Sequence, residues 1–224
     1  MITKLPSWIW LWTWVLAFVA GIINVVGFLS FEHQAITHLT GTTTLLGAAL
    51  SDGNGNVFLH RLCIVGSFLF GAVLSGILIK EATLKLGRRY GLVLLLEALF
   101  LLLAVPMLNR GMPMGIYLAG SACGLQNAMA STYSGTVIRT CHVTGMFTDL
   151  GIFIGHSLRG VPIERRRLQL SLIVISAFLA GGAFGGFLFR FMGYATLYVP
   201  AFITGTIALV YTVSLSLTRK QSAC

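Results

Sequence analysis

Six stretches of the chain are almost continuously apolar. They run over residues 9–31, 57–79, 90–108, 115–133, 168–187 and 195–217. A helix of about 20 apolar residues is long enough to cross the hydrocarbon core of a bilayer. The pattern therefore predicts an all-α integral membrane protein with six transmembrane helices.

Two further stretches, 34–52 and 138–158, are only half apolar and are rich in Thr and Gly. Both contain the phrase H-[LV]-T-G-x-x-T-x-L-G, which begins at His38 and again at His142. Flanking residues match as well, since G-I-I-N precedes the first phrase, G-L-Q-N precedes the second, and residues 68–78 resemble 178–188. Such self-similarity predicts an internal duplication, with repeats over 1–108 and 109–224 that each hold three spans and one H-x-T-G segment.

The placement of charge decides how these two segments are expected to sit. Lys and Arg concentrate in 80–89, 159–167 and the C-terminal tail, and such segments favour the cytoplasmic side. If both H-x-T-G segments crossed, loop 80–89 and the tail would face opposite sides. If neither crosses, all three basic segments and Lys4 share the cytoplasm. We therefore expect re-entrant segments that enter from opposite faces, although full spans remain the alternative.

Irregular backbone at membrane depth needs protein or a water-filled cavity around it. The two re-entrant segments are therefore expected to meet inside the bundle. Inverted repeats with a ligand site at the midplane are common in secondary transporters. Both termini are expected in the cytoplasm, with the chain in the cell inner (cytoplasmic) membrane.

Composition agrees with a membrane protein whose partner is the lipid bilayer. The 224 residues are 56% hydrophobic and 9% charged, against about 25% charged in soluble domains. The net charge of +9 reads as a topology signal rather than as a nucleic-acid surface. The four cysteines have no C-x-x-C spacing, so neither a disulfide framework nor a metal site is indicated. We expect no cofactor and no enzymatic activity, because no nucleophile–base pair or phosphate loop is apparent.

The H-x-T-G segments carry the candidate binding chemistry. Thr40 and Thr144 are predicted N-caps of short helices, whose N-terminal dipoles favour an anion or an electron-rich polar group. The candidate substrate-binding residues are His38, Thr40, Gly41, Thr42, Thr44, His142, Thr144, Gly145, Thr148, Asn24, Gln126 and Asn127. The alternatives are that Thr-Gly permits close helix packing, that the histidines bond backbone carbonyls, and that the amides link helices.

Two acids lie within apolar or half-apolar segments. Glu97 is in the middle of 90–108, and Asp149 lies inside the second phrase. An acid at membrane depth is costly unless it is paired or faces a cavity, so both are candidates for proton coupling. A structural ion pair is the alternative for Glu97, and a favourable interaction with its own helix N-terminus is the alternative for Asp149.

Small residues repeat every four positions in two of the predicted spans. They are Gly71 and Ser75 in the first repeat, and Gly181, Gly182, Gly185 and Gly186 in the second. Such patterns allow helix backbones to approach closely. They indicate close packing either within the bundle or in a homo-oligomer.

These motifs together resemble a known family. The motifs are the first phrase with its preceding G-x-x-N, G-L-Q-N-A over 124–128, and T-G-x-x-T-D-L-G over 144–151. A chain with these motifs in this order is similar to the YoaK-like family of uncharacterised bacterial inner-membrane proteins. The resemblance extends from about residue 14 to 217. It implies a multi-pass membrane protein and names no substrate.

The expected function is a membrane transporter of a small polar or anionic solute, with protons as the candidate coupling ion and the site between the two H-x-T-G helices. A passive channel or facilitator with the same filter is one alternative. A non-transporting membrane scaffold is another.

Overall fold

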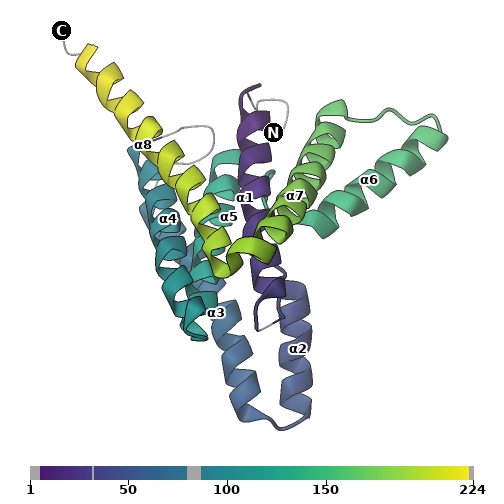
Figure 1. Cartoon of the computed structure of the whole chain (residues 1–224). Helices are drawn as coiled ribbons and strands as arrows, with labels where there is room; N and C mark the ends of the chain where they lie inside the picture. The colour runs from purple at the N-terminus through teal and green to yellow at the C-terminus, as the bar shows by residue number, and fades with distance from the viewer. Residues whose placement is uncertain (1–5, 32, 80–86, 222–224) are drawn as a thin grey trace.

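The computed structural model describes residues 6–31, 33–79 and 87–221. All regular structure in these ranges is helical, so the predicted fold class is confirmed at that level (Figure 1). The elements are α1 (Ile9–Leu29), α2 (Leu39–Ser51), α3 (Gly55–Leu78), α4 (Arg88–Asn109), α5 (Met114–Ser134), α6 (Val143–Leu158), α7 (Arg165–Met192), the 3-10 helix η2 (Gly193–Leu197) and α8 (Tyr198–Gln221). Lys4, Lys80 and Lys85, which support the predicted topology, lie outside the described residues.

Four helical stretches of the described chain are long and apolar enough to cross a membrane. They are Ile9–Leu29, Gly55–Leu78, Arg89–Asn109 and Arg165–Ser214, the last of which takes in α7, η2 and part of α8. Each of the six predicted apolar segments is helical, but α5 is not among the four stretches. Large apolar side chains are exposed on the outer helices, for example Leu179, Phe191 and Phe202 at 70–75%. Long apolar helices with such surfaces are typical of a membrane protein.

Helices α1 and α7 lie side by side and run in the same direction. Gly181 lies against Phe18 and Gly185 against Ile22, so residue numbers rise together along both helices. Gly21 in turn faces the Phe178 carbonyl. A Cβ at Gly21 or Gly181 would overlap the backbone of the other helix, so glycine is what lets these two backbones meet.

Helices α3 and α5 make the same kind of pair. His60 lies beside Tyr117, and Gly71 lies against Ser121 and Leu125, so these helices are also parallel. Gly124 faces the Phe68 carbonyl. In the predicted duplication Gly124 and Gly71 correspond to Gly21 and Gly181, so the same backbone contact is made at two pairs of matching positions.

These contacts use most of the predicted small-residue pattern inside the bundle. Gly71, Gly181 and Gly185 each face a neighbouring helix, and Ser75 has no exposed surface. Gly182 and Gly186 are half-buried, and added Cβ atoms there meet no close contact. Of the two predicted roles for this pattern, packing within the bundle is therefore the one that Gly71, Gly181 and Gly185 serve in the structure.

Helices α4 and α8 complete the bundle as an antiparallel pair. Gly91 lies near Thr212 and Gly205 near Ala98, and the Tyr211 hydroxyl donates to the Gly87 carbonyl at 3.2 Å. The rings of Trp8 and Tyr90 both contact Tyr133. The starts of α1 and α4 and the ends of α5 and α8 therefore meet at one end of the bundle, which we call the termini end.

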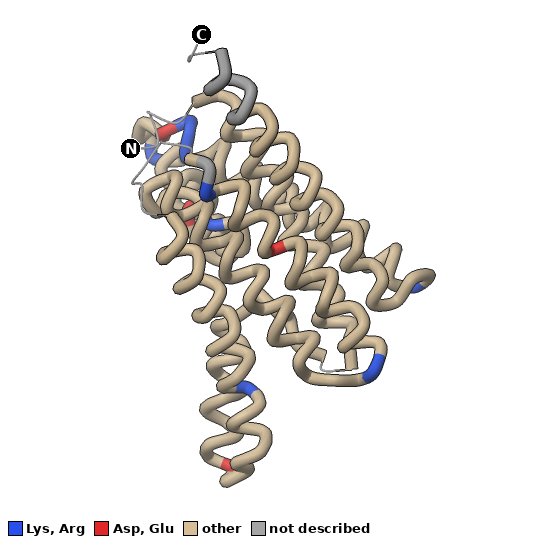
Figure 2. The backbone as a smooth tube through the Cα atoms, turned by 90° about the vertical axis from the view of Figure 1, so that its left-hand side faces the viewer, with Lys and Arg blue, Asp and Glu red and all other residues tan. Residues whose placement is uncertain are grey.

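Basic residues gather toward the termini end. Figure 2 shows Lys and Arg near the two chain termini, with fewer at the opposite end. The described basic segments 87–89 and 159–167 open α4 and α7, which both start at the termini end. The predicted grouping of these basic segments on one side is consistent with this arrangement.

Helices α2 and α6 each fold back on the helix that follows. α2 packs along α3, and α6 packs along α7 (Figure 1). Both turns use a left-handed glycine, Gly53 and Gly160, each with φ of 68°. The amides of Asn54 and Val161 donate to the carbonyls of Ala49 and His156, so both helices end in a Schellman motif.

The buried apolar side chains form two clusters. One, which includes Leu16, Val93 and Met129, lies toward the termini end. The other, which includes Val26, Leu108 and Ile116, lies toward the opposite end. Phe100 packs against both clusters, so they meet in the middle of the bundle, around the glycine contacts and a few buried polar groups.

The twin glycine contacts predict opposite effects of two similar substitutions on α3. Gly71→Ala places a Cβ against the Ser121 backbone and should destabilise the protein by about 1–3 kcal/mol. Gly66→Ala, where an added Cβ meets nothing within 4 Å, should be neutral or stabilise by up to ~1 kcal/mol. Thermal unfolding in detergent, followed by tryptophan fluorescence, measures both. Equal melting temperatures for the two variants would contradict the α3–α5 packing.

Candidate functional site

The segment before α2 turns back along α1 and is held there by Asn24. The Asn24 Oδ1 atom accepts hydrogen bonds from the Thr37 backbone amide at 3.0 Å and from the Thr37 hydroxyl at 2.8 Å. Ile36 and the Gln34 carbonyl lie over Gly27. Asn24 is five residues before the end of α1, about 7–8 Å along the helix axis, so the chain returns by that distance before α2 begins.

The segment before α6 turns back along α5 and is held by Gln126. The Thr140 hydroxyl donates to Gln126 Oε1 at 2.9 Å, and the Ile138 amide donates to the Ser134 hydroxyl at 2.8 Å. Gln126 is eight residues before the end of α5, about 12 Å along its axis. An amide on the preceding helix thus anchors each of the two segments.

Both segments carry a strained residue. His33 has φ of 50° and Thr136 has φ of 68°, and these are the non-glycine residues with positive φ in the part of the chain that the structure describes. Each lies a few residues before one of the two phrases. This conformation is unfavourable for residues with a Cβ and persists where surrounding contacts impose it.

The repeated phrase begins differently from the prediction. The N-cap positions belong to His38 and His142, and neither side chain makes a capping hydrogen bond. The predicted caps Thr40 and Thr144 lie inside the helices, so that prediction is wrong. Each His ring instead lies against the glycine three residues on, Gly41 or Gly145. A Cβ there would overlap the ring, which explains the His–Gly spacing in both phrases.

The hydroxyls of the phrases bond within their own helices. Thr44 donates to the Thr40 carbonyl at 3.0 Å, and Thr148 donates to the Thr144 carbonyl at 3.1 Å. Buried Thr42 donates to the His38 carbonyl at 3.3 Å. The remaining side chains named here, His38, Thr40, Thr44, His142, Thr144 and Thr148, are exposed, while Gly41 and Gly145 are half-buried.

The structure does not bring the two phrases together. α2 packs along α3 and α6 along α7, on separate parts of the bundle. The expected midplane site between them is therefore not formed. The physical reason is the short turn after each helix, 52–54 or 159–164, which holds the helix against its successor.

A buried polar chain lies instead between α4, α5 and the segment before α6. Glu97 is fully buried, and its Oε1 accepts a hydrogen bond from Gln126 Nε2 at 2.9 Å. Gln126 then accepts from Thr140 at 2.9 Å. The second carboxyl oxygen, Oε2, is buried and makes no hydrogen bond to any described residue. We call Glu97, Gln126 and Thr140 the polar chain.

The other predicted polar residues lie outside this chain of hydrogen bonds. Asp149 is half-buried in the second turn of α6. Asn127 is half-buried, and its Oδ1 has no hydrogen-bond partner among the described residues. Of the two candidate acids, Glu97 is the one the structure places in a buried network.

Arg61 on α3 is a charged residue that the sequence reasoning missed. Its Nε and Nη1 atoms are buried and make no hydrogen bond within the described chain. The signal was present, because Arg61 is a cation inside the predicted span 57–79. Within the described ranges, no group of three or more His, Cys, Asp and Glu side chains is placed to hold a metal ion.

The four helical stretches of the described chain that are long and apolar enough to cross a membrane indicate a helical membrane protein. The chain belongs to the DUF1275 family, described as a protein of unknown function, whose family model matches residues 12–210. The resemblance to YoaK-like proteins is consistent with this family. Comparison with curated proteins and with solved structures gave no match.

The polar chain predicts a contrast between two neighbouring amides on α5. Gln126→Met removes the partner of both Glu97 and Thr140 and should cost about 1–2 kcal/mol of stability. Asn127→Leu removes an amide whose Oδ1 has no bond among the described residues, and should change stability by less than about 0.5 kcal/mol. Thermal unfolding of the purified variants compares them. An equal or larger loss in Asn127→Leu would contradict the assignment.

Proposed function

We propose that this protein is a membrane transporter of a small polar or anionic solute, coupled to protons through Glu97. The observation that carries the proposal is the Glu97 carboxyl, which is fully buried with one oxygen bonded to Gln126 and the other without a partner among the described residues. Buried acids in membrane proteins mark proton relays and solute paths.

The physical argument is the cost of leaving this carboxylate charged. An unpaired acid at the centre of a bilayer costs about 2.5–3.5 kcal/mol on insertion scales. This cost falls if the second carboxyl oxygen, Oε2, is protonated or accepts a hydrogen bond from a donor group of a solute. Exchange of one for the other at Glu97 is the simplest form of coupling.

The polar chain also offers a mechanical link. Gln126 bonds Glu97 on one side and Thr140 on the other, so a change at the carboxyl alters the anchor of segment 135–142. That segment contains strained Thr136 and leads directly into α6. Protonation at α4 is therefore coupled to the position of α6.

The architecture we propose is a pair of inverted repeats, 1–108 and 109–224. Two pairs of parallel helices support it, α1 with α7 and α5 with α3. The helices of each pair meet at matching glycines, and one pair runs in the opposite direction to the other. α2 and α6 share a His–Gly start and a Schellman end. In this arrangement α1, α3, α4, α5, α7 and α8 span, and 34–52 and 138–158 are re-entrant from opposite faces.

We place the solute site beside the polar chain rather than between the two phrases. Asn24 and Gln126 hold the starts of the broken segments, so the phrases act as supports for α2 and α6. The basic segments favour a cytoplasmic termini end in the cell inner membrane. An anionic solute is favoured by the N-terminal dipoles of α2 and α6.

Proton movement in proteoliposomes tests the proposal. The protein is reconstituted with pyranine inside, and inward gradients of acetate, lactate, phosphate, glycine and glycerol are applied in turn. We expect at least one solute to drive proton uptake, Glu97→Gln to abolish it, and Asp149→Asn to retain at least half of the rate.

Two outcomes contradict the proposal. Solute-driven proton uptake that is unchanged in Glu97→Gln removes Glu97 from the mechanism. Solute flux that is independent of a proton gradient in the wild type and in both variants favours a passive channel. Size-exclusion profiles of the variants establish that each is folded.

A further inference from the structure

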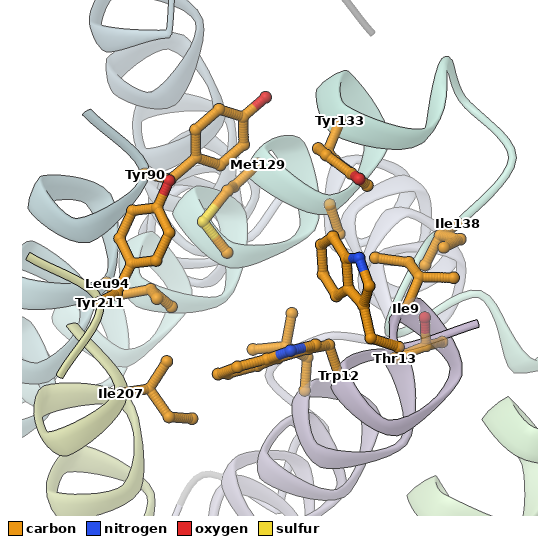
Figure 3. A pocket seen from close by; sticks show the side chains of 13 residues that line it. Ile9, Trp12, Thr13, Tyr90, Leu94, Met129, Tyr133, Ile138, Ile207 and Tyr211 are labelled. Atoms are coloured by element: carbon orange, nitrogen blue, oxygen red, sulfur yellow. The ribbon is translucent and has the colours of Figure 1, made fainter. Parts of the chain in front are cut away.

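A cavity of about 270 Å³ lies at the termini end of the bundle. Figure 3 shows its side chains around a common space, with Tyr90 and Tyr211 on the side of α4 and α8, and Trp12 and Tyr133 on the side of α1 and α5. Segment 135–142 adds Ile138. The cavity is therefore built from both repeats and from the segment that Gln126 anchors.

The wall is mainly aromatic and apolar, and it contains the buried Thr13 hydroxyl, which has no hydrogen-bond partner among the described residues. Five rings line it, those of Trp8, Trp12, Tyr90, Tyr133 and Tyr211. Thr13 also lines it, is only 2% exposed, and its Oγ1 makes no hydrogen bond within the described chain. Other buried threonines in helices, such as Thr204, bond a carbonyl of the preceding turn. A buried hydroxyl without a partner is costly, and a bound molecule can satisfy it.

The chemistry of the wall selects an uncharged ligand. None of the 13 lining residues is Asp, Glu, Lys or Arg, so a charged molecule would lose its hydration without a counter-charge. Aromatic rings favour stacking and edge contacts with another ring. The volume lies just below the usual range for small-molecule sites, about 300–1,000 Å³, which suits a single ring with a short substituent.

We infer that this cavity is a binding site for a small uncharged aromatic molecule that carries one hydroxyl or amine group, which bonds Thr13 Oγ1. The inference rests on the cavity alone and holds whether or not the protein transports a solute. A lipid acyl chain is the competing occupant. It fits the apolar wall but leaves the Thr13 hydroxyl without a partner.

Binding of p-cresol to the full chain in lipid nanodiscs tests the site, with empty nanodiscs subtracted to remove partition into lipid. We expect saturable binding of one p-cresol per chain, measured by equilibrium dialysis and by tryptophan fluorescence. Toluene, which has the same ring and no hydroxyl, should bind about tenfold more weakly, the effect of one neutral hydrogen bond. Benzoate and benzyltrimethylammonium should bind more weakly still.

Three variants make the assignment specific. Thr13→Val keeps the shape of the side chain and removes its hydroxyl. The affinity for p-cresol should therefore fall about tenfold, to that for toluene. Ala130→Leu fills part of the cavity and should abolish binding of both molecules. Trp14→Phe is the control, because Trp14 stacks on Phe18 and does not line the cavity, and it should bind p-cresol as the wild type does.

Each contrary result has a defined meaning. If p-cresol binding to the folded wild-type protein, checked by its unfolding temperature, does not saturate, the site is overturned. Equal affinity for p-cresol and toluene, or no effect of Thr13→Val, overturns the hydroxyl-bearing ligand and leaves an acyl-type filling. Tighter binding of benzoate or benzyltrimethylammonium overturns the uncharged class. Since no assay here measures flux, none of these results bears on proton-coupled transport.

Discussion

The close contact of helix backbones at glycine is the constraint on which the rest of the structure depends. Gly21 and Gly181 bring α1 onto α7, and Gly124 and Gly71 bring α5 onto α3. In lipid the hydrophobic effect does not drive helices together, so close packing and interhelical hydrogen bonds must do so. The same contact is made twice, each time between a helix of residues 1–108 and a helix of residues 109–224, and it fixes two parallel pairs that run in opposite directions. Helices α4 and α8 then complete the bundle.

This framework determines where the buried polar groups lie. With α1 and α5 fixed, Asn24 and Gln126 each reach the segment that follows their helix. α4 packs on α5, which places Glu97 against Gln126 in an apolar interior. The aromatic cavity is one helical turn away, because Leu94 and Met129 line it at three residues from Glu97 and Gln126. A buried acid and a ligand-sized space are thus neighbours.

Much of this fold follows from the sequence, because apolar runs, a repeated phrase and spaced glycines each act locally. Residues 68–78 and 178–188 resemble each other because both carry the glycine face of a parallel pair.

Which helices pack side by side does not follow from the sequence in the same way. Charge indicates which side a loop favours but not which helix α2 or α6 packs on, so the expected meeting of the phrases did not form. The His38–Gly41 contact is found in place of the expected Thr40 N-cap. Residue preferences at helix N-caps do not include packing of a His ring on a glycine, so they could not predict it. Trp12, Tyr90, Tyr133 and Tyr211 are far apart in sequence, so the cavity had no local signature.

The central claim is that the two repeats are built in opposite senses, with α2 and α6 returning to opposite faces of the membrane. Asp52 and Pro162 are exposed residues in the turns that follow these two helices. In a background in which Cys63, Cys123, Cys141 and Cys224 are replaced by Ser, single variants Asp52→Cys and Pro162→Cys are labelled with a membrane-impermeant maleimide in sealed vesicles of known orientation. The account predicts that the reagent labels the two cysteines from opposite sides. Labelling of both from the same side would contradict it.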